Sequence, residues 1–371
     1  MENTVKKKVL VGMSGGVDSS TAASILLEQG YEVYGATLKL WDGVSTCDRQ
    51  TRTCCSLEDV EDARDSAFKL GIPFYVLNMK DLFREKVVDY FADSYLVGET
   101  PNPCIACNQY LKFHAMLQKA IALGMDYIAT GHYAQVTHDH KSGRHLLKKA
   151  VDISKDQSYV LYMLHQEQLK RLLLPLGDYK KTEVREIAGR KGLVNARKPD
   201  SQDICFVQNG SYVDFIREYR GIDIPEGTYI DAQGHVLGKN KGMIHYTIGQ
   251  RKGLGMSFPE PRYVIGKDSA ANTVTLGLKE EAMVTSLLAA DMNYIVCEKP
   301  EPDMKVLART RYSQQEVPAK VIPLEGNRAR IVFEKPQPFV APGQSVVLYL
   351  GDYVMGGGVI KSTDHEGNNT K

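Results

Sequence analysis

The stretch VLVGMSGGVDSSTAASILLEQG (residues 9–30) decides the fold of the first half of the chain. It begins with a short apolar run typical of a buried strand, passes through Ser14-Gly15-Gly16, and continues with helical periodicity up to a glycine. Two adjacent glycines let backbone N–H groups turn inward, because no Cβ stands in the way. The start of the next helix adds unpaired donors and a partial positive charge. The sequence therefore predicts a strand–turn–helix unit that holds phosphate.

The residues around the two glycines indicate which class of phosphate site this is. The hydroxyls of Ser14 and Ser19 can add hydrogen bonds, and Asp18 can help to position Mg²⁺. The lysine of a Walker loop is missing, and so is GxGxxG spacing, which disfavours a γ-phosphate cradle or a dinucleotide site. The alternative without function is a glycine turn followed by a capped helix.

The segments that follow alternate between strand-like and helix-like patterns. This order is typical of βαβ units, and it predicts an α/β domain whose parallel sheet has helices on both faces. Ligands of such sheets bind at the carboxyl ends of the strands. Strand-like segments lie at 8–13, 32–40, 73–78 and 126–130, and helix-like segments lie at 18–29, 57–70, 82–95 and 109–123.

After about residue 219 the pattern changes to short runs rich in Val, Ile, Tyr and Thr, separated by turn signals such as DAQGH and GKNKG. These runs predict antiparallel strands and hairpins. Two prolines in CEKPEPDMK (residues 297–305) would interrupt a strand, so this stretch is expected to be a loop within the last β region. Cys297 is expected to be a packing residue.

Composition is that of a soluble globular protein, with 371 residues and a formal net charge of +1. No stretch approaches 18 apolar residues, so we expect a cytoplasmic protein without a membrane segment, in which thiols stay reduced. The number of cysteines is seven, and an odd number indicates reactive thiols more than a set of structural disulfides. Residues 141–198 contain fourteen Lys and Arg against six Asp and Glu, which is typical either of a polyanion-binding surface or of a solvated helix face.

Several stretches carry a resemblance to known families. SGGVDS in its strand–turn–helix context resembles the PP-loop of the ATP pyrophosphatase superfamily, whose members split ATP between the α- and β-phosphates. TPNPCIACNQYLKF (100–113) and PDSQDICFV (199–207) together resemble the tRNA-specific 2-thiouridylase family. Further matching stretches, in chain order, are ATGHYA (129–134), SKDQSYVLY (154–162), YTIGQRKGLG (246–255), RTRYS (309–313) and APGQSVVLY (341–349).

The resemblance implies an activity: ATP-dependent replacement of the C2 oxygen of the tRNA wobble uridine by sulfur. Attack of that oxygen on the α-phosphate would make it part of AMP, a good leaving group. Cys205 would carry the incoming sulfur as a persulfide received from a sulfur carrier protein. Cys107 would then release the sulfur and leave a transient Cys107–Cys205 disulfide. Both steps need thiolate character, for which His132 and the basic segment are candidate sources of positive field.

One departure from the family pattern concerns Cys104, which stands where many members have aspartate in NPD. Cys104 could substitute as a weaker acid–base group, or line a pocket for the target base with Asn102 and Pro103. A third alternative is that Cys104, Cys107 and Cys205 hold a [4Fe–4S] cluster with an open fourth position. Cys47, Cys54 and Cys55 form a group for which zinc binding is weakly indicated and an ordinary loop is favoured.

The resemblance also implies binding residues and partners. The cofactors would be ATP and Mg²⁺, and the main partner would be the anticodon arm of tRNA, whose wobble base must leave its stack. The ATP-binding set is Gly12, Met13, Ser14, Gly15, Gly16, Val17, Asp18, Ser19, Leu38 and Gly131. The tRNA-contacting set is Asn102, Pro103, Cys104, His132, Lys155, Asp156, Gln157, Arg311, Tyr312 and Gln344.

The expected domains follow from the same resemblance. They are a PP-loop catalytic domain at 1–218, a small central β domain at 219–283, a C-terminal β-barrel at 284–365 and a disordered tail at 366–371. Two other functions stay open. An amidoligase of the same superfamily acting on a small metabolite would not need Cys107 and Cys205. An RNA-binding protein with a relic loop should have lost Asp18 or the glycines.

Overall fold

The computed structural model describes residues 6–41, 57–195, 204–207 and 211–365. The chain divides into two compact units, each with its own hydrophobic core. The first unit comprises Met1–Val88, Pro103–Asn209 and Asp352–Val354, and the second comprises Asp89–Asn102, Gly210–Gly351 and Met355–Lys371. The expected tail at 366–371 lies outside the described residues, as do Cys47, Cys54 and Cys55.

The first unit is built on a five-stranded sheet of order β3-β2-β1-β4-β7 in which every pairing is parallel. The predicted parallel sheet is therefore confirmed. The strand order changes direction at β1, which lies between β2 and β4, and the carboxyl ends at such a point form the usual ligand crevice. The strands are β1 (Lys8–Gly12), β2 (Glu32–Lys39), β3 (Phe74–Asn78), β4 (Tyr127–Ala129) and β7 (Leu172–Leu173).

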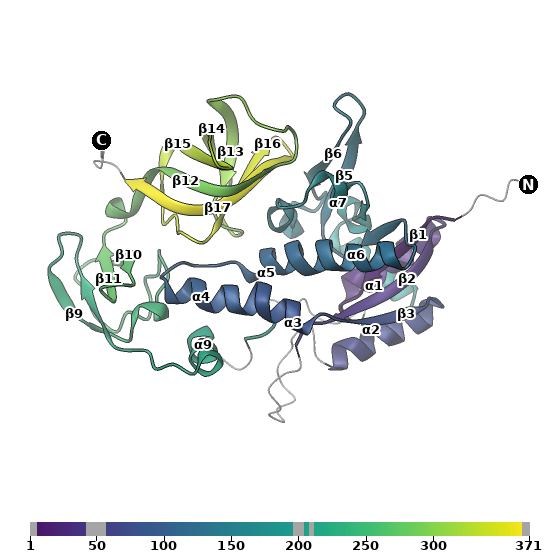
Figure 1. Ribbon diagram of the computed structural model, residues 1–371, viewed down its shortest axis with the longest axis horizontal. Coiled ribbons are helices and arrows are strands. Elements are labelled where there is room, and N and C mark those ends of the chain that lie inside the picture. The colour runs from purple at the N-terminus through teal and green to yellow at the C-terminus, as the bar shows by residue number, and fades with distance from the viewer. Residues whose placement is uncertain (1–5, 42–56, 196–203, 208–210, 366–371) are drawn as a thin grey trace, which may run out of the picture. The chain divides into compact units, whose positions relative to one another are not determined.

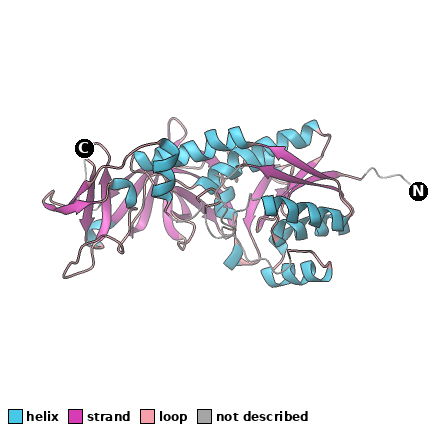
Figure 2. Ribbon diagram, turned by 90° about the horizontal axis from the view of Figure 1, so that it is seen from below, coloured by secondary structure: helices cyan, strands magenta, loops and turns pink. Residues whose placement is uncertain are grey.

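Helices cover both sides of this sheet (Figure 2). Helices α1 (Val17–Glu28) and α2 (Leu57–Leu70) share one core with the alternate residues Val9 and Val11 of β1 and with Val33 of β2. Helix α6 (Met116–Ala122) contacts β4. Alternation along a strand sends successive side chains to opposite faces, so a continuous apolar run such as β1 needs a helix on each side.

The two cysteines of the CxxC lie on one continuous helical run rather than before it. The predicted start at 109 is wrong, since the run begins with α5 (Pro103–Ala106) and passes through η2 (Cys107–Ala115) into α6. η2 has π-helical hydrogen bonding, which is rare and frequently occurs at functional sites. A second π-helical stretch, η1 (Arg84–Asp89), follows α3 (Lys80–Phe83).

The basic segment contains a β-hairpin that the sequence patterns did not predict. Strands β5 (Ala134–Asp139) and β6 (Arg144–Lys149) pair antiparallel, and the Asp139 carboxylate accepts hydrogen bonds from the turn residues Lys141 and Ser142. The remaining elements of this unit are η3 (Ile153–Lys155), η4 (Ser158–Leu161), α7 (Gln166–Leu169), η5 (Pro175–Asp178) and α8 (Lys181–Arg190).

The second unit includes a four-stranded sheet of order β10-β11-β8-β9. The expectation of purely antiparallel pairing is wrong here, because β8 and β11 run parallel. The chain makes a long excursion between these two strands, and a parallel pair needs such a crossover. The elements are α4 (Tyr90–Leu96), α9 (Tyr212–Arg220), β8 (Gly227–Ile230), β9 (Val236–Asn240), η6 (Met243–His245), β10 (Tyr263–Asp268), β11 (Thr273–Gly277) and η7 (Glu280–Ala282).

The last six strands form a closed barrel, as expected (Figure 1). Their order is β12-β15-β14-β13-β16-β17, and a further β12–β17 pairing closes the ring. The residues 297–303 lie in the connection between β12 and β13, as predicted, whereas Met304 and Lys305, expected in the same loop, begin β13. Cys297 packs against the barrel core, which confirms the second prediction. The strands are β12 (Met283–Tyr294), β13 (Met304–Arg309), β14 (Val317–Leu324), β15 (Arg328–Pro338), β16 (Ser345–Leu350) and β17 (Tyr353–His365).

Candidate nucleotide and thiol site

The glycine turn lies at the carboxyl end of β1, where α1 begins. Gly15 has φ +71°, and a Cβ there would come 2.4 Å from the carbonyl oxygen of Asp59. No other residue fits, because both the conformation and the space require glycine. Ser19 Oγ accepts a hydrogen bond from the Ser14 N–H at 3.1 Å and donates one to the Gly16 carbonyl at 3.2 Å. The turn is thus held by its own residues.

Asn195 holds the turn from the other side. Its Nδ2 lies 3.1 Å from the Gly15 carbonyl oxygen, 3.0 Å from that of Gly16 and 2.9 Å from Ser20 Oγ. In a trans peptide the C=O and the following N–H point in opposite directions. The N–H groups of Gly16 and Val17 therefore point away from Asn195, which leaves them for an anion. Sequence reasoning missed Asn195, since a single asparagine about 180 positions away carries no local signal.

The carboxylate of Asp18, in the first turn of α1, is engaged by two side chains. Lys181 Nζ lies 2.8 Å from each carboxylate oxygen, and the Tyr133 hydroxyl donates to Oδ1 at 2.8 Å. The Lys181 side chain is 11% exposed, and its ammonium lies 5.6 Å from the centre of the Tyr133 ring. Sequence reasoning noted that the Walker lysine is absent but did not find Lys181, the first residue of α8.

Gly131 follows β4 and lies directly against the start of α1. A Cβ on Gly131 would come 2.7 Å from the backbone nitrogen of Ser19 and 2.8 Å from the carbonyl carbon of Asp18. The backbone at this glycine therefore does pack closely, as expected, but its neighbour in the structure is the first turn of α1. A contact between Gly131 and a nucleotide stays a prediction.

His132, the next residue, shares a hydrogen bond of 2.7 Å between its Nδ1 and Thr130 Oγ1, and its ring lies 5.5 Å from that of Phe113. Burial, and secondarily the Lys112 ammonium, holds the pKa of His132 well below its ordinary value. The imidazole is therefore neutral near pH 7. A neutral imidazole argues against His132 as a source of positive field for the thiols.

The segment 155–157 braces the loop after β4. Asp156 is buried, with its Oδ1 accepting from the Ala150 N–H at 3.0 Å and its Oδ2 from the Ser158 hydroxyl at 2.7 Å. Gln157 Oε1 accepts from the Tyr133 N–H at 2.9 Å. These contacts give Asp156 and Gln157 a structural role here, whereas Lys155 is partly exposed.

The three cysteines singled out by sequence all lie in the first unit. Cys104 is exposed, Cys107 is buried and Cys205 is partly buried, and none is in a disulfide. Phe206, next to Cys205, packs on Phe83 of α3 with ring centroids 5.7 Å apart, and α3 also contacts η2, which begins at Cys107. Both thiols are therefore attached to elements that adjoin α3.

A metal-holding arrangement is not found in the described part of the chain. Among these residues, no three His, Cys, Asp or Glu side chains are gathered so that they could hold an ion, and the set searched includes Cys104, Cys107 and Cys205. The [4Fe–4S] alternative therefore gains no support from the geometry. Within the same residues, no helix is both long and apolar enough to cross a membrane.

Four residues of the predicted tRNA-contacting set lie in the second unit: Asn102, Arg311, Tyr312 and Gln344. Arg311 Nη2 donates to the carbonyl oxygens of Ile248 at 2.6 Å and Phe339 at 3.0 Å. Gln344 Nε2 donates to the Thr100 carbonyl at 2.7 Å, and Tyr312 is 42% exposed. The other predicted residues, including the whole ATP-binding set with the partly buried Leu38, lie in the first unit.

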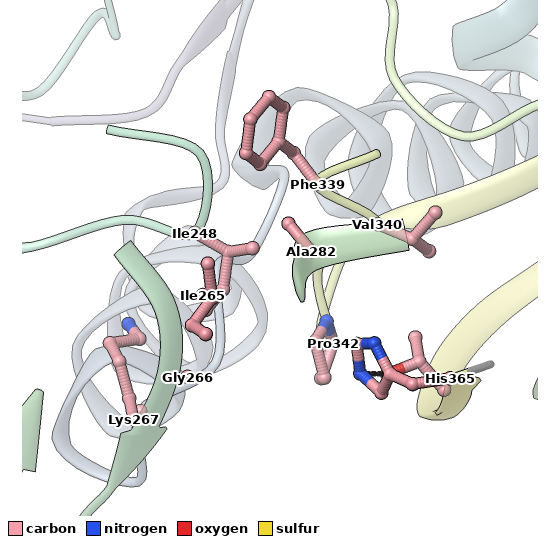
Figure 3. Close-up of a pocket in the computed structure, with 11 residues that line it drawn as sticks. Ile248, Ile265, Gly266, Lys267, Ala282, Phe339, Val340, Pro342 and His365 are labelled. Atoms are coloured by element: carbon pink, nitrogen blue, oxygen red, sulfur yellow. Dashed lines mark hydrogen bonds between the residues drawn. The ribbon is translucent and has the colours of Figure 1, made fainter. Parts of the chain in front are cut away.

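Ile248 and Phe339 also line a cavity of about 230 Å³ in the second unit (Figure 3). Lys267 and His365 contribute polar groups to its wall. Lys267 Nζ donates to the Tyr246 carbonyl at 3.0 Å, and burial lowers the pKa of this lysine to about 8.

An α/β unit with a PP-loop, followed by β-rich segments that end in a closed barrel, defines a nucleotide-using protein of the PP-loop class. Family models match in three consecutive parts: "tRNA methyl transferase HUP domain" at residues 7–209, "tRNA methyl transferase PRC-barrel domain" at 213–278 and "Aminomethyltransferase beta-barrel domain" at 284–360. The expected domain limits, which differ from these by several residues, stay a prediction.

Curated relatives match almost end to end. A protein of Acetivibrio thermocellus named tRNA-specific 2-thiouridylase MnmA is 54% identical over 96% of this chain and 99% of its own length. Relatives of the same name from Moorella thermoacetica and Clostridioides difficile are 53% and 49% identical over 95% and 97% of this chain, with 99% of each relative covered. The chain therefore belongs to the tRNA-specific 2-thiouridylase family.

Proposed function

We propose that the protein is an ATP-dependent tRNA-uridine 2-sulfurtransferase, which converts the wobble uridine (position 34) of tRNA to 2-thiouridine with release of AMP and pyrophosphate. The observation that carries this proposal is identity of 54% to a relative so named, over 96% of the chain. The glycine turn and the thiols of the first unit are the groups that such a reaction needs.

Activation of the uridine is assigned to the phosphate turn. The N–H groups of Gly16 and Val17, directed outward by Asn195, would hold the phosphates of ATP at the start of α1. Asp18 supplies the carboxylate oxygens that Mg²⁺ prefers. The uracil O2 attacks the α-phosphorus and its N3 proton is lost. The bond to the bridging oxygen breaks, and its electron pair leaves with pyrophosphate.

Sulfur transfer is assigned to two thiols in the stretches that carry the family resemblance, Cys205 and Cys107. The terminal sulfur of a Cys205 persulfide attacks C2, and AMP leaves with the former O2. The Cys107 thiolate then attacks Cys205 Sγ, which releases 2-thiouridine and forms a Cys107–Cys205 disulfide. A cellular dithiol must reduce this disulfide before the next turnover. The persulfide comes from a sulfur carrier protein.

Recognition of the tRNA anticodon arm is assigned to residues of both units. Tyr312 has an exposed ring of the kind that stacks on unpaired bases, and the Arg309 guanidinium lies 5.4 Å from the centre of that ring. Cys104, exposed on α5, is proposed to line the pocket of the target base together with Asn102 and Pro103. A thiol there replaces the carboxylate of the usual pattern and leaves a weaker acid.

The test is to incubate the purified chain with Mg²⁺·ATP, a persulfide donor and unmodified tRNA, and to measure thiouridine and AMP by mass spectrometry. Cys205→Ser and Cys107→Ser should abolish multiple-turnover thiolation. Cys297→Ser, at a thiol that packs on the barrel core, should retain it. Full thiolation by either active-site variant would refute the thiol assignment. ATP-dependent amidation of a small metabolite with no tRNA product would favour the amidoligase instead.

A further inference from the structure

The phosphate turn carries no cation of its own. The residues GMSGGVDS (12–19) include neither lysine nor arginine, although the proposed reaction must neutralise a triphosphate and then a departing pyrophosphate. Among the residues that the structure describes, Lys181 brings an ammonium group to this place from 163 positions further along the chain. It is bonded to both oxygens of the Asp18 carboxylate.

The position of Lys181 is fixed by its surroundings on α8. Its backbone N–H donates to Asp152 Oδ2 at 3.0 Å, and its side chain passes the Tyr133 ring on the way to Asp18. The side chain is 11% exposed, so it has little access to water as an alternative partner. An ammonium group in such a place needs an anionic partner at all times, because burial of an unpaired charge is costly.

Lys181 and Mg²⁺ would compete for the same carboxylate. Asp18 Oδ1 already accepts hydrogen bonds from Lys181 and Tyr133, and Oδ2 accepts from Lys181. A carboxylate offers about four lone-pair sites, and Mg²⁺ needs its ligands at roughly 2.0–2.1 Å. A divalent ion bound that closely would repel the ammonium. The polyphosphate arriving with the metal offers more negative charge than Asp18 does.

On the basis of the proposed function, we propose that Lys181 is the phosphate-binding cation of this site: it is stored on Asp18 in the free protein and passes to the β-phosphate side of ATP when Mg²⁺ occupies the carboxylate. Once transferred, the ammonium stabilises the charge that pyrophosphate gains as the bond to the α-phosphorus breaks.

The first test measures equilibrium binding by calorimetry, without tRNA or sulfur. The ligands are AMP and the α,β-methylene analogue of ATP, each with Mg²⁺. Lys181→Met should weaken binding of the analogue roughly 10- to 100-fold, as expected for a lost charge-assisted hydrogen bond, and should leave AMP affinity within about twofold. Lys181→Arg should recover part of the loss. Lys180→Met, at an exposed neighbour, is the matched control and should bind both ligands normally.

The opposite results are equally informative. Equal weakening of AMP and the analogue in Lys181→Met would show a merely structural lysine, and unchanged affinity for both would show that the lysine does not meet phosphate. Either result overturns the proposal. Failure of thiouridine formation in the wild-type protein would refute the proposed function, yet these binding results would stand, so the two failures are distinguishable.

A second arm does not depend on the folding of Lys181→Met. In the absence of Mg²⁺, Asp18→Asn removes the carboxylate that retains Lys181. The variant should therefore bind the metal-free analogue more tightly than the wild-type protein does, while losing the gain in affinity that Mg²⁺ confers. Metal-free affinity equal to or below that of the wild type would overturn storage of Lys181 on Asp18.

Discussion

Asn195 fixes the phosphate turn through a single buried amide. Its side-chain nitrogen donates hydrogen bonds to two successive carbonyl oxygens, those of Gly15 and Gly16. These bonds keep both carbonyls pointing away from the side on which an anion would bind. The residue sets the orientation of the N–H donors through these two carbonyls. It therefore acts as a positioning residue, whereas Lys181 is proposed to touch phosphate.

Two substitutions of Asn195 test this positioning role through the stability of the protein and its KM for ATP. Asn195→Ala removes the amide donor from the Gly15 carbonyl, while the Gly16 carbonyl keeps the Ser19 hydroxyl as a donor. The loss should lower the free energy of unfolding by about 1–3 kcal/mol and raise the KM for ATP. Asn195→Asp places a carboxylate against the same carbonyls and should cost more than alanine in both measurements. Urea denaturation and an ATP titration of pyrophosphate release provide the check. An aspartate variant as stable as the alanine variant would contradict this role.

At the scale of elements, the contact between the end of β4 and the start of α1 determines how the nucleotide turn is presented. Gly131 permits this contact, because its missing side chain leaves room for the backbone of Asp18 and Ser19. The neighbouring atoms belong to helix backbone, so they cannot move aside as a flexible side chain would. The end of β4 and the helix that begins at the phosphate turn are thus in direct contact.

Gly131→Ala should displace the first turn of α1. Overpacking of this kind typically costs about 1–3 kcal/mol of stability, and we expect weaker ATP binding in addition. Gly189→Ala is the matched control, since a Cβ at Gly189 on α8 meets nothing within 4 Å and alanine is the better helix former by roughly 0.5–1 kcal/mol. Thermal melts and ATP calorimetry of both variants decide the matter. Unchanged stability and unchanged ATP binding in Gly131→Ala would show that the contact between β4 and α1 tolerates a side chain.

Local signals in the sequence were sufficient for much of this arrangement. The bounds of α2 were predicted to the residue because its periodicity ends at Gly71, and the glycine turn was recognised because strand, turn and helix are contiguous. Lys181 and Asn195 were missed, since their contacts join residues more than 150 positions apart. The residues of the π-helical stretch at Cys107 follow no pattern that separates a π-helix from an α-helix, so the sequence predicted only a helix.

At the scale of the whole molecule, the predicted RNA contacts are spread over both compact units, whereas the nucleotide turn and the thiols belong to one of them. The nucleotide turn and the thiols lie in the first, and Arg311, Tyr312 and Gln344 lie in the second. Arg311 joins parts of the second unit by holding the carbonyls of Ile248 and Phe339. The nearby partly buried lysine Lys267 is expected to make the stability of this unit dependent on pH.

Lys267 has a folded pKa of about 8 against 10.5 as its ordinary value, because burial disfavours the charged form. Between these two values the unfolded chain binds more protons than the folded one, so this lysine makes stability rise with pH there. Below pH 8 the charged lysine costs at most about 3 kcal/mol. Lys267→Met should lack the rise.

The measurement is chemical denaturation of the second unit's transition at pH 7 and pH 9.5. The difference between the two pH values should be smaller in Lys267→Met than in the wild-type protein. Lys239→Met, at an exposed lysine of β9, should reproduce the wild-type difference. A Lys267→Met protein with the wild-type pH dependence would show that the lysine is not desolvated.

A chain of short contacts inside the first unit has a consequence for how such enzymes diversify. Gly131 abuts α1, Tyr133 is bonded to Gln157, and Asn108, next to Cys107, donates to the Val160 carbonyl at 3.0 Å. The spacing between the phosphate turn and the helix that carries Cys107 is consequently set by neighbours inside the first unit, none of which belongs to the barrel. Sequence changes in the barrel can therefore accumulate while these contacts of the first unit stay as they are.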